Sequence, residues 1–481
     1  MQIRFSTVAL ILVICIALFF SLYKLTESPS VWYDEGWYTQ AAMNLAETGV
    51  DGLQLAPDNI YHASLLTTVG YPLIYPLGLW MKIFGSSVLA ARSFMLLCIL
   101  GFLFVAFLLI RRLSGKTIAL GALALLATLP TLYGNGKSVL GEVPGLLYLV
   151  FSLLCISFVR SDGNRKYSWI ILGGVSAGLC IVTKPLFLVF IPALAVGTFL
   201  EWKRGSLNLK EVIGGIVCAL LPVLVWVMVQ FRGDTSMLSV IKYYANPYQI
   251  TDLFSVILSN VGHLFTSIGN IYLVGTILIW CVALALRMRS KNKIPAEEII
   301  AFIFTLLVIA AFLRTAGWYR YLFPAQVLSL LFFPGAFSVL GEYFGRYVSV
   351  IRHHWQKAVV VIIVFLSVYG TYQLAFDSWV AEAYSSHKTA FWQEYLGHLP
   401  PTRSVFFYNT PEVVIFMPHR NYRQYIVPAG GVVGQDQLLF LELGIPDVAI
   451  VESDSYTEGK SPFENYTLDK TAYKYSILKK K

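Results

Sequence analysis

Two adjacent carboxylates, Asp34 and Glu35, stand in the aromatic stretch VWYDEGWY, directly after an apolar run long enough to cross a membrane. A carboxylate that aromatic side chains shield from water holds a proton more tightly, so it can act as a general base toward a hydroxyl group. A structural role is the alternative, because an aspartate here can cap a short helix that ends near Gly49. One residue can serve both purposes, so we take Asp34 as the candidate base and Glu35 as a supporting residue.

Aromatic side chains flank this pair on both sides. Tryptophan and tyrosine often anchor a chain at the membrane–water interface, and this is the first interpretation of Trp37 and Tyr38. Contact with the apolar face of a substrate is the second interpretation. His62, in the same loop, can shuttle protons or bind a metal, although a lone loop histidine usually does neither. We keep these three residues as possible substrate contacts.

A second acid, Glu142, begins a later apolar run in the stretch GEVPGLLY. A carboxylate at the edge of a membrane is costly unless it is paired or used, so we add Glu142 to the catalytic candidates. The alternative is again a helix start, which both Glu142 and Pro144 favour.

Basic residues on the same side are few, and several stand at the ends of apolar runs rather than in polar loops. The candidates for binding an anionic group are Lys137, Lys184, Arg314 and Arg320, together with Tyr321. A cation held at the membrane surface suits the phosphate of a lipid-linked molecule. Any single one of them could instead extend its charge to the interface along an apolar stem. As a set, with acids opposite, they favour a site for an anionic lipid.

Two kinds of site find no support in the sequence. Histidine, cysteine and carboxylate residues form no cluster with the spacing of metal ligands. The phosphate-binding pattern GxxxxGK[ST] is missing as well, so we do not expect a cytoplasmic nucleotide as donor. We therefore predict no cofactor, and the residues leave the use of a divalent metal open.

Composition sets the class of protein that must position these side chains. Hydrophobic residues make up 57% of the 481 residues and charged residues 13%, whereas soluble proteins carry about 25% charged residues. The chain is therefore predicted to be a polytopic α-helical membrane protein. Its net charge of +9 needs no nucleic-acid partner to explain it. All six cysteines lie in apolar runs, which predicts buried thiols and no disulfide framework.

Apolar runs long enough to span a membrane recur about eleven times, each with roughly 17–25 residues. They lie near 7–23, 88–110, 117–133, 142–159, 168–182, 185–200, 211–230, 263–286, 297–313, 319–340 and 357–375. The first run is predicted to be a membrane helix rather than a signal peptide, since no clear cleavage site follows it. The segment 67–84 contains Pro72 and Pro76 and is predicted to be a helix that lies in the interface.

Charge gives an independent test of this arrangement. Five loops are rich in lysine and arginine, and they lie near 111–116, 160–166, 203–210, 287–293 and 346–357. With eleven spans all five fall on one side of the membrane, which the positive-inside rule makes the cytoplasm. Residues 25–66, on the other side, contain acids but no lysine or arginine. Asp34 is therefore predicted to face away from the cytoplasm.

The last part of the chain loses the long apolar runs. We predict a transmembrane domain over residues 1–375 and a small mixed α/β domain outside the membrane over residues 376–481. The stretches RSVFFYNTPEVVIFMP and PDVAIVES are predicted to be short strands with turn residues between them.

These features together resemble a known family. The first span followed by WYDEGWYTQAAMNLAETG, then GYPLIYPLGLWMKIFGSSVLAARS and the basic RRLSGK, is similar to the GT-C class of membrane glycosyltransferases. The specific likeness is to the protein O-mannosyltransferase and lipid A aminoarabinose transferase superfamily, and GEVPGLLY and RYLFP also fit. The likeness covers roughly residues 1–340, and about eleven spans look like the mannosyltransferase branch.

The resemblance implies an inverting transfer of a sugar from a polyprenyl-phosphate donor, on the outer face of the membrane and without a nucleotide. The catalytic acid of the family corresponds to Asp34, and a second-loop acid corresponds to Glu142. The phosphate-binding cations would fall among Lys137, Lys184, Arg314 and Arg320. The acceptor would be the hydroxyl of a lipid, a glycan or a protein, and the membrane would be the bacterial inner (plasma) membrane.

The chain departs from the family at one point. The aminoarabinose transferases carry an acid and a lysine just before the two prolines of the first loop, whereas this chain reads TTVGYPLIY there. The resemblance therefore does not extend to that sugar, and His62 or Lys82 would have to take the role of the missing pair. The alternative from another class is a transporter or flippase for a lipid-linked saccharide, which predicts charges near the middle of the bilayer and broken helices. A scaffold that keeps the fold without the chemistry is a third interpretation.

Overall fold

The computed structural model describes residues 2–62, 69–159, 165–230, 246, 250–266, 268–290, 293–426 and 444–481. Parts of the first outer loop and of the basic loops near 160–166 and 287–293 lie outside these ranges. Within the described ranges, eight helical segments are long and apolar enough to cross a membrane, or nine if one bent pair forms a single span. The chain is thus an integral membrane protein, and the number of eleven spans stays a prediction.

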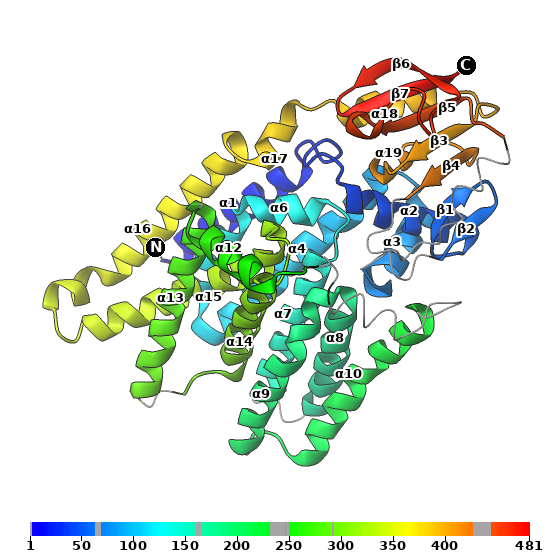
Figure 1. Cartoon of the computed structure of the whole chain (residues 1–481). Coiled ribbons are helices and arrows are strands. Elements are labelled where there is room, and N and C mark those ends of the chain that lie inside the picture. Colours follow the sequence, from blue (N-terminus) through cyan, green and yellow to red (C-terminus); the bar gives the residue numbers. More distant parts are fainter. Residues whose placement is uncertain are drawn as a thin grey trace.

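A bundle of helices fills most of the molecule (Figure 1). Its helices are α1 (Gln2–Leu22), α4 (Val88–Ser114), α5 (Lys116–Ala127), α6 (Pro130–Lys137), α7 (Glu142–Val159), α8 (Lys166–Thr183), α9 (Phe190–Lys203), α10 (Leu209–Gln230), α12 (Leu253–Thr266), α13 (Ile268–Arg289), α14 (Ala296–Phe312), α15 (Phe323–Phe344) and α16 (Ser349–Phe376). Short 3₁₀ turns precede α9 (η2, Pro185–Val189) and α15 (η3, Tyr319–Leu322). Apolar side chains of α4, α5, α7, α14 and α15 form the buried centre, where α15 is covered along most of its length.

The segment near 117–133, predicted as one span, consists of two helices. The axes of α5 and α6 meet at 64°. Pro130, the first residue of α6, explains the break, because proline has no amide hydrogen and disfavours helical geometry in the residue before it. The bend carries Lys137, at the end of α6, into the interior of the protein.

The first outer loop forms a compact layer at one end of the bundle. It contains α2 (Tyr33–Thr48), the hairpin β1 (Leu53–Ala56) and β2 (Asn59–Tyr61), and α3 (Tyr71–Phe84). Helix α2 ends at Gly49, whose φ of 77° is the left-handed conformation expected of a glycine cap. The idea that Asp34 caps this helix is wrong, because α2 begins before Asp34. Glu35 has that role instead, since its Oε2 accepts a hydrogen bond from the Trp32 amide at 3.3 Å.

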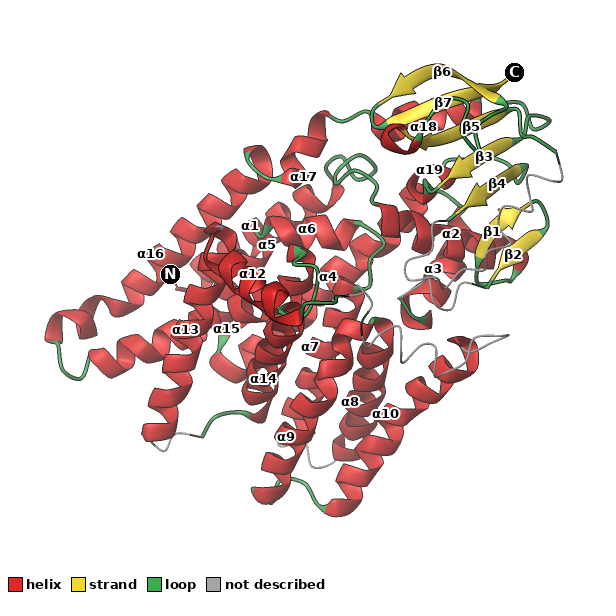
Figure 2. Cartoon of the chain, viewed as in Figure 1, coloured by secondary structure: helices red, strands yellow, loops and turns green. Residues whose placement is uncertain are grey.

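The C-terminal residues form the predicted small α/β unit, which lies on the same end as the first outer loop (Figure 2). Three short helices, α17 (Trp379–Glu382), α18 (Lys388–Gly397) and α19 (Pro411–Val414), accompany the strands β3 (Val405–Tyr408), β4 (Tyr422–Tyr425), β5 (Val448–Glu452), β6 (Tyr466–Ala472) and β7 (Tyr475–Lys480). The sheet has the order β4-β3-β5-β7-β6, with the first three strands parallel and the last two antiparallel.

The strand prediction for this unit is confirmed in part. Strands β3 and β5 lie in the two stretches that the sequence marks. The second half of RSVFFYNTPEVVIFMP is instead the one-turn helix α19, which begins at Pro411. Proline is favoured at the first helical position because its missing amide hydrogen would have no partner there.

Candidate functional site

Asp34 and Arg320 form an ion pair between the first turn of α2 and the turn η3 before α15. Nη1 of Arg320 donates to Oδ2 of Asp34 at 2.5 Å, although 286 residues separate them in the sequence. The guanidinium also lies over the rings of Trp318, at 4.9 Å, and Tyr321, at 5.3 Å. The side chains of Arg320 and Asp34 are 16% and 20% exposed, so the pair is mostly buried but keeps some contact with the surface.

Glu142 and Lys184 form a second ion pair, which is fully buried. Nζ of Lys184 lies 2.5 Å from Oε1 of Glu142, at the junction of α7 with the short connection between α8 and η2. Oε2 of Glu142 is buried without a hydrogen-bond partner, and so is Nε of Arg320. The negative charge of Glu142 acts on Arg320, so the two pairs belong to one electrostatic group. The group retains one donor and one acceptor for a further polar ligand.

Glu35 pairs with Arg92 of α4 directly behind Asp34. Nε and Nη2 of Arg92 each donate to a different oxygen of Glu35 at 2.8 Å, and Nη1 donates to the Leu25 carbonyl at 2.9 Å. The Arg92 and Glu35 side chains are 0% and 1% exposed. No solvent or substrate reaches them, so this pair fixes the start of α2 and thereby the position of Asp34.

Lys137 is a buried cation without a carboxylate partner among the described residues. Its Nζ donates to the Tyr23 carbonyl at 2.8 Å, and the residue has no exposed surface. The positive charge of Arg92 acts on it from nearby. Burial of an uncompensated charge is costly, so an anion in this region would stabilise the folded protein.

The C-terminal unit also contacts α2, the helix that carries Asp34. The hydroxyl of Tyr33 donates a short hydrogen bond to Oδ1 of Asn409. Burial raises the pKa of Tyr33 strongly, and the negative charges of Glu412 and Asp34 raise it further. Tyr33 therefore stays neutral beside Asp34. At Gly36 any larger side chain would collide with the backbone of α19, so the two elements lie in direct contact.

The remaining predicted residues lie in different surroundings. Trp37 and Tyr38 are 7% and 2% exposed and pack in the apolar core of the outer layer, which makes them structural in this conformation. His62 follows β2, and its Nδ1 lies 2.7 Å from the Asp51 carbonyl. Arg314 is exposed at the end of α14, apart from the Asp34–Arg320 pair.

Two features of this region escaped the sequence predictions. The position of Arg92 was an indication, because a charge near the start of an apolar run is costly without a partner. Asn409 carried none, since an asparagine after a short strand is usually a turn residue. Among the described residues no three histidine, cysteine or carboxylate side chains lie close enough to hold a metal ion.

Comparison with known proteins shows which known fold this chain has. Residues 72–228 match the family model described as dolichyl-phosphate-mannose-protein mannosyltransferase. ArnT from Cupriavidus metallidurans bound to undecaprenyl phosphate superposes with a TM-score of 0.68 at 15% identity, over 98% of this chain and 97% of that one. The apo state of the same protein gives 0.63 at 14% identity, over 98% of each chain.

An archaeal protein gives a match with a lower TM-score. The archaeal oligosaccharyltransferase AglB from Archaeoglobus fulgidus, in complex with an inhibitory peptide and a dolichol-phosphate, gives a TM-score of 0.58 at 13% identity, over 94% of this chain and 70% of that one. No curated protein sequence matches the chain significantly. The predicted GT-C fold is confirmed: this chain shares the architecture of ArnT and AglB, and its residues 72–228 resemble the dolichyl-phosphate-mannose-protein mannosyltransferases.

Proposed function

We propose that the chain is an inverting glycosyltransferase, which moves a sugar from a polyprenyl-phosphate donor to a hydroxyl group of a lipid, glycan or protein. The observation that carries the proposal is the partly exposed Asp34–Arg320 pair, beside cations that exceed the local carboxylates. The family match over residues 72–228 and the lipid phosphates named with ArnT and AglB support the class of donor.

Asp34 is the proposed general base. Its carboxylate takes the proton of the acceptor hydroxyl while the hydroxyl oxygen forms a bond to the anomeric carbon of the sugar. The bond from that carbon to the phosphate oxygen breaks, the phosphate keeps the electron pair, and the configuration at the carbon inverts. Arg320 holds the Asp34 carboxylate in place during this step.

Fixed cations stabilise the charge that develops on the leaving phosphate. A guanidinium has five donors, and Nε of Arg320 is still without a partner while Nη1 contacts Asp34. Lys137 supplies a buried positive charge that no described carboxylate offsets. Preorganised charges of this kind act without reorganisation at the moment of reaction. Glu142 orients Lys184 and leaves one oxygen for the acceptor.

The location follows the charge pattern of the loops. We infer that the basic connections face the cytoplasm of a bacterial inner membrane, and that the site and the domain of residues 376–481 face outward. The transporter alternative would place its ion pairs near the middle of the bilayer. Asp34 and Glu35, by contrast, begin a helix of the outer layer rather than a spanning helix, and the comparisons give a transporter no support.

The test is release of polyprenyl phosphate by the purified, reconstituted full chain. The reaction contains polyprenyl-phosphate hexose and an acceptor extract from the same cells. Asp34→Asn should lower the rate by about 10²–10⁴-fold, the usual contribution of a general base. Asp58→Asn is the matched control, because Asp58 is exposed in the turn of the β1–β2 hairpin of the same loop, and it should keep the full rate. An undiminished rate for folded Asp34→Asn would refute the assignment.

A further inference from the structure

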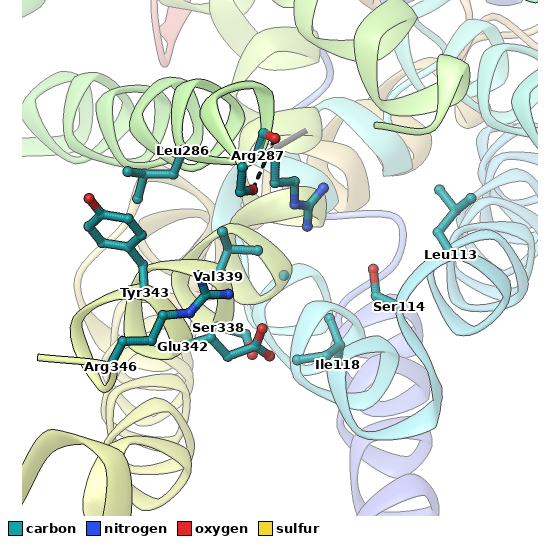
Figure 3. Close-up of a pocket in the computed structure, with 12 residues that line it drawn as sticks. Leu113, Ser114, Ile118, Leu286, Arg287, Ser338, Val339, Glu342, Tyr343 and Arg346 are labelled. Carbon is teal, nitrogen blue, oxygen red and sulfur yellow. Dashed lines mark hydrogen bonds between the residues drawn. The ribbon is translucent and has the colours of Figure 1, made fainter. Parts of the chain in front are cut away.

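A cavity lies at the far end of the bundle from the C-terminal unit. It is a half-open hollow bordered by the C-terminal ends of α4, α13 and α15 and by the start of α5, and its volume is about 280 Å³ (Figure 3). Small-molecule sites begin at about this size, near 300 Å³. The loops around it belong to the side that the sequence predicts to be cytoplasmic, so the cavity is separate from the Asp34 site.

Two arginines and several hydroxyl groups line this cavity. Arg287 is 18% exposed and already donates to Glu298 with Nη1, while its guanidinium has further donors. Arg346 is exposed at the mouth, and the described residues offer its side chain no ion-pair partner. Ser114 and Ser338 present hydroxyl groups from α4 and α15. Guanidinium and hydroxyl groups are the donors that bind phosphate oxygens.

The lining of the cavity carries two arginines and one acid, and Glu298, outside the lining, already pairs with Arg287. Glu342 is the one acid in its lining, against Arg287 and Arg346. Helix C-termini carry partial negative charge, so arginines in this position could serve only to offset the three helix ends. Arg346, however, lies beyond the last residue of α15 and lines an open volume rather than packing on the helix. Aliphatic side chains such as Leu286 and Val339 complete the wall.

We propose that this cavity binds a phosphate group, carried either by the headgroup of an anionic phospholipid or by a small soluble phosphate. Arg346 and Arg287 contact the phosphate oxygens, the serine hydroxyls complete the contacts, and the aliphatic wall accommodates the glycerol or carbon part of the ligand. The volume fits a headgroup and excludes acyl chains, which would remain in the bilayer. The occupant would contact four helices, α4, α5, α13 and α15.

The experiment measures lipid binding by native mass spectrometry of the full chain in detergent, titrated with phosphatidylglycerol or with phosphatidylcholine. A second arm measures inorganic phosphate binding by calorimetry. Arg346→Ala should weaken binding of phosphatidylglycerol about tenfold, the effect of removing one charge-assisted contact. Arg111→Ala is the matched control, because Arg111 is an exposed arginine at the end of α4 that does not line the cavity.

The outcomes separate the two sources and test the site. If Arg346→Ala weakens binding of phosphatidylglycerol but not of inorganic phosphate, and Arg111→Ala weakens neither, the ligand is a lipid headgroup. The same pattern for inorganic phosphate alone identifies a soluble ligand. Equal loss with both variants shows that only the general positive charge of this surface attracts anions, and it overturns the proposal. Equal affinity for phosphatidylglycerol and phosphatidylcholine without phosphate binding also overturns it, and circular dichroism establishes that both variants are folded.

Discussion

Replacement of Arg92 by methionine should destabilise the protein far more than loss of an ordinary ion pair. Arg92 makes two hydrogen bonds to Glu35 and one to the Leu25 carbonyl, all between 2.8 and 2.9 Å, and neither charged side chain reaches solvent. Removal of one partner leaves the Glu35 carboxylate buried and unpaired. Such a change costs about 3–5 kcal/mol, which is roughly a 10²–10⁴-fold change in the folding equilibrium.

The assay is chemical denaturation in detergent micelles, followed by tryptophan fluorescence. Glu35→Gln combined with Arg92→Met should cost less than Arg92→Met alone, because the double variant buries no unpaired charge. Lys479→Met removes the pair with Asp469, whose two side chains are 53% and 27% exposed, and it should cost at most about 1 kcal/mol. If Arg92→Met costs no more than Lys479→Met, or less than the double variant, the argument for a buried structural pair is refuted.

Three further predictions concern the first outer loop and the C-terminal unit. Gly36→Ala should lower the free energy of unfolding by about 1–3 kcal/mol, because its Cβ would collide with α19. Gly214→Ala, with open space in α10, should not lower it. Tyr33→Phe should cost about 1 kcal/mol in the same assay through loss of its hydrogen bond to Asn409, and an unchanged midpoint would contradict this. Burial lowers the pKa of His419, so protonation favours the unfolded state. Stability should therefore fall below about pH 6.5, and denaturation of His419→Gln between pH 5 and pH 7.5 should show a smaller fall; an identical pH profile would disprove it.

The ion pairs show which parts of the candidate site can be predicted from the sequence. Asp34, Glu142, Lys184 and Arg320 were identifiable one by one, because a charge beside an apolar run is costly unless it has a partner or a use. Their pairing was not identifiable, since it depends on how η3 packs against a helix 286 residues earlier in the chain. The same physics applies to Arg92, whose partner Glu35 was known only as a neighbour of Asp34.

The fold shows the same division between local and distant information. Hydropathy marked the helical segments, and Pro130 carried the signal for the bend between α5 and α6. The apolar stretches of β3 and β5 were visible as strands, but the order β4-β3-β5-β7-β6 was not. Parallel strands need long connections, so their neighbours are chosen by packing rather than by local sequence. The burial of Trp37 and Tyr38 could not be predicted for a similar reason, because they pack in one apolar cluster with α3 and with Ile426 of the C-terminal unit.

Contact between α2 and the C-terminal unit has a consequence for biogenesis. Tyr33 meets a residue 376 positions later, and Gln40 donates to and accepts from side chains 382 to 384 positions later. Chains fold from the N-terminus during synthesis, so the membrane helices are in the bilayer before strands β3 and β4 exist. Helix α2, which carries Asp34, is therefore covered by the C-terminal unit only after the membrane helices are inserted. A nascent chain whose membrane helices are inserted still lacks its finished outer surface, which forms only when residues 376–481 dock on α2.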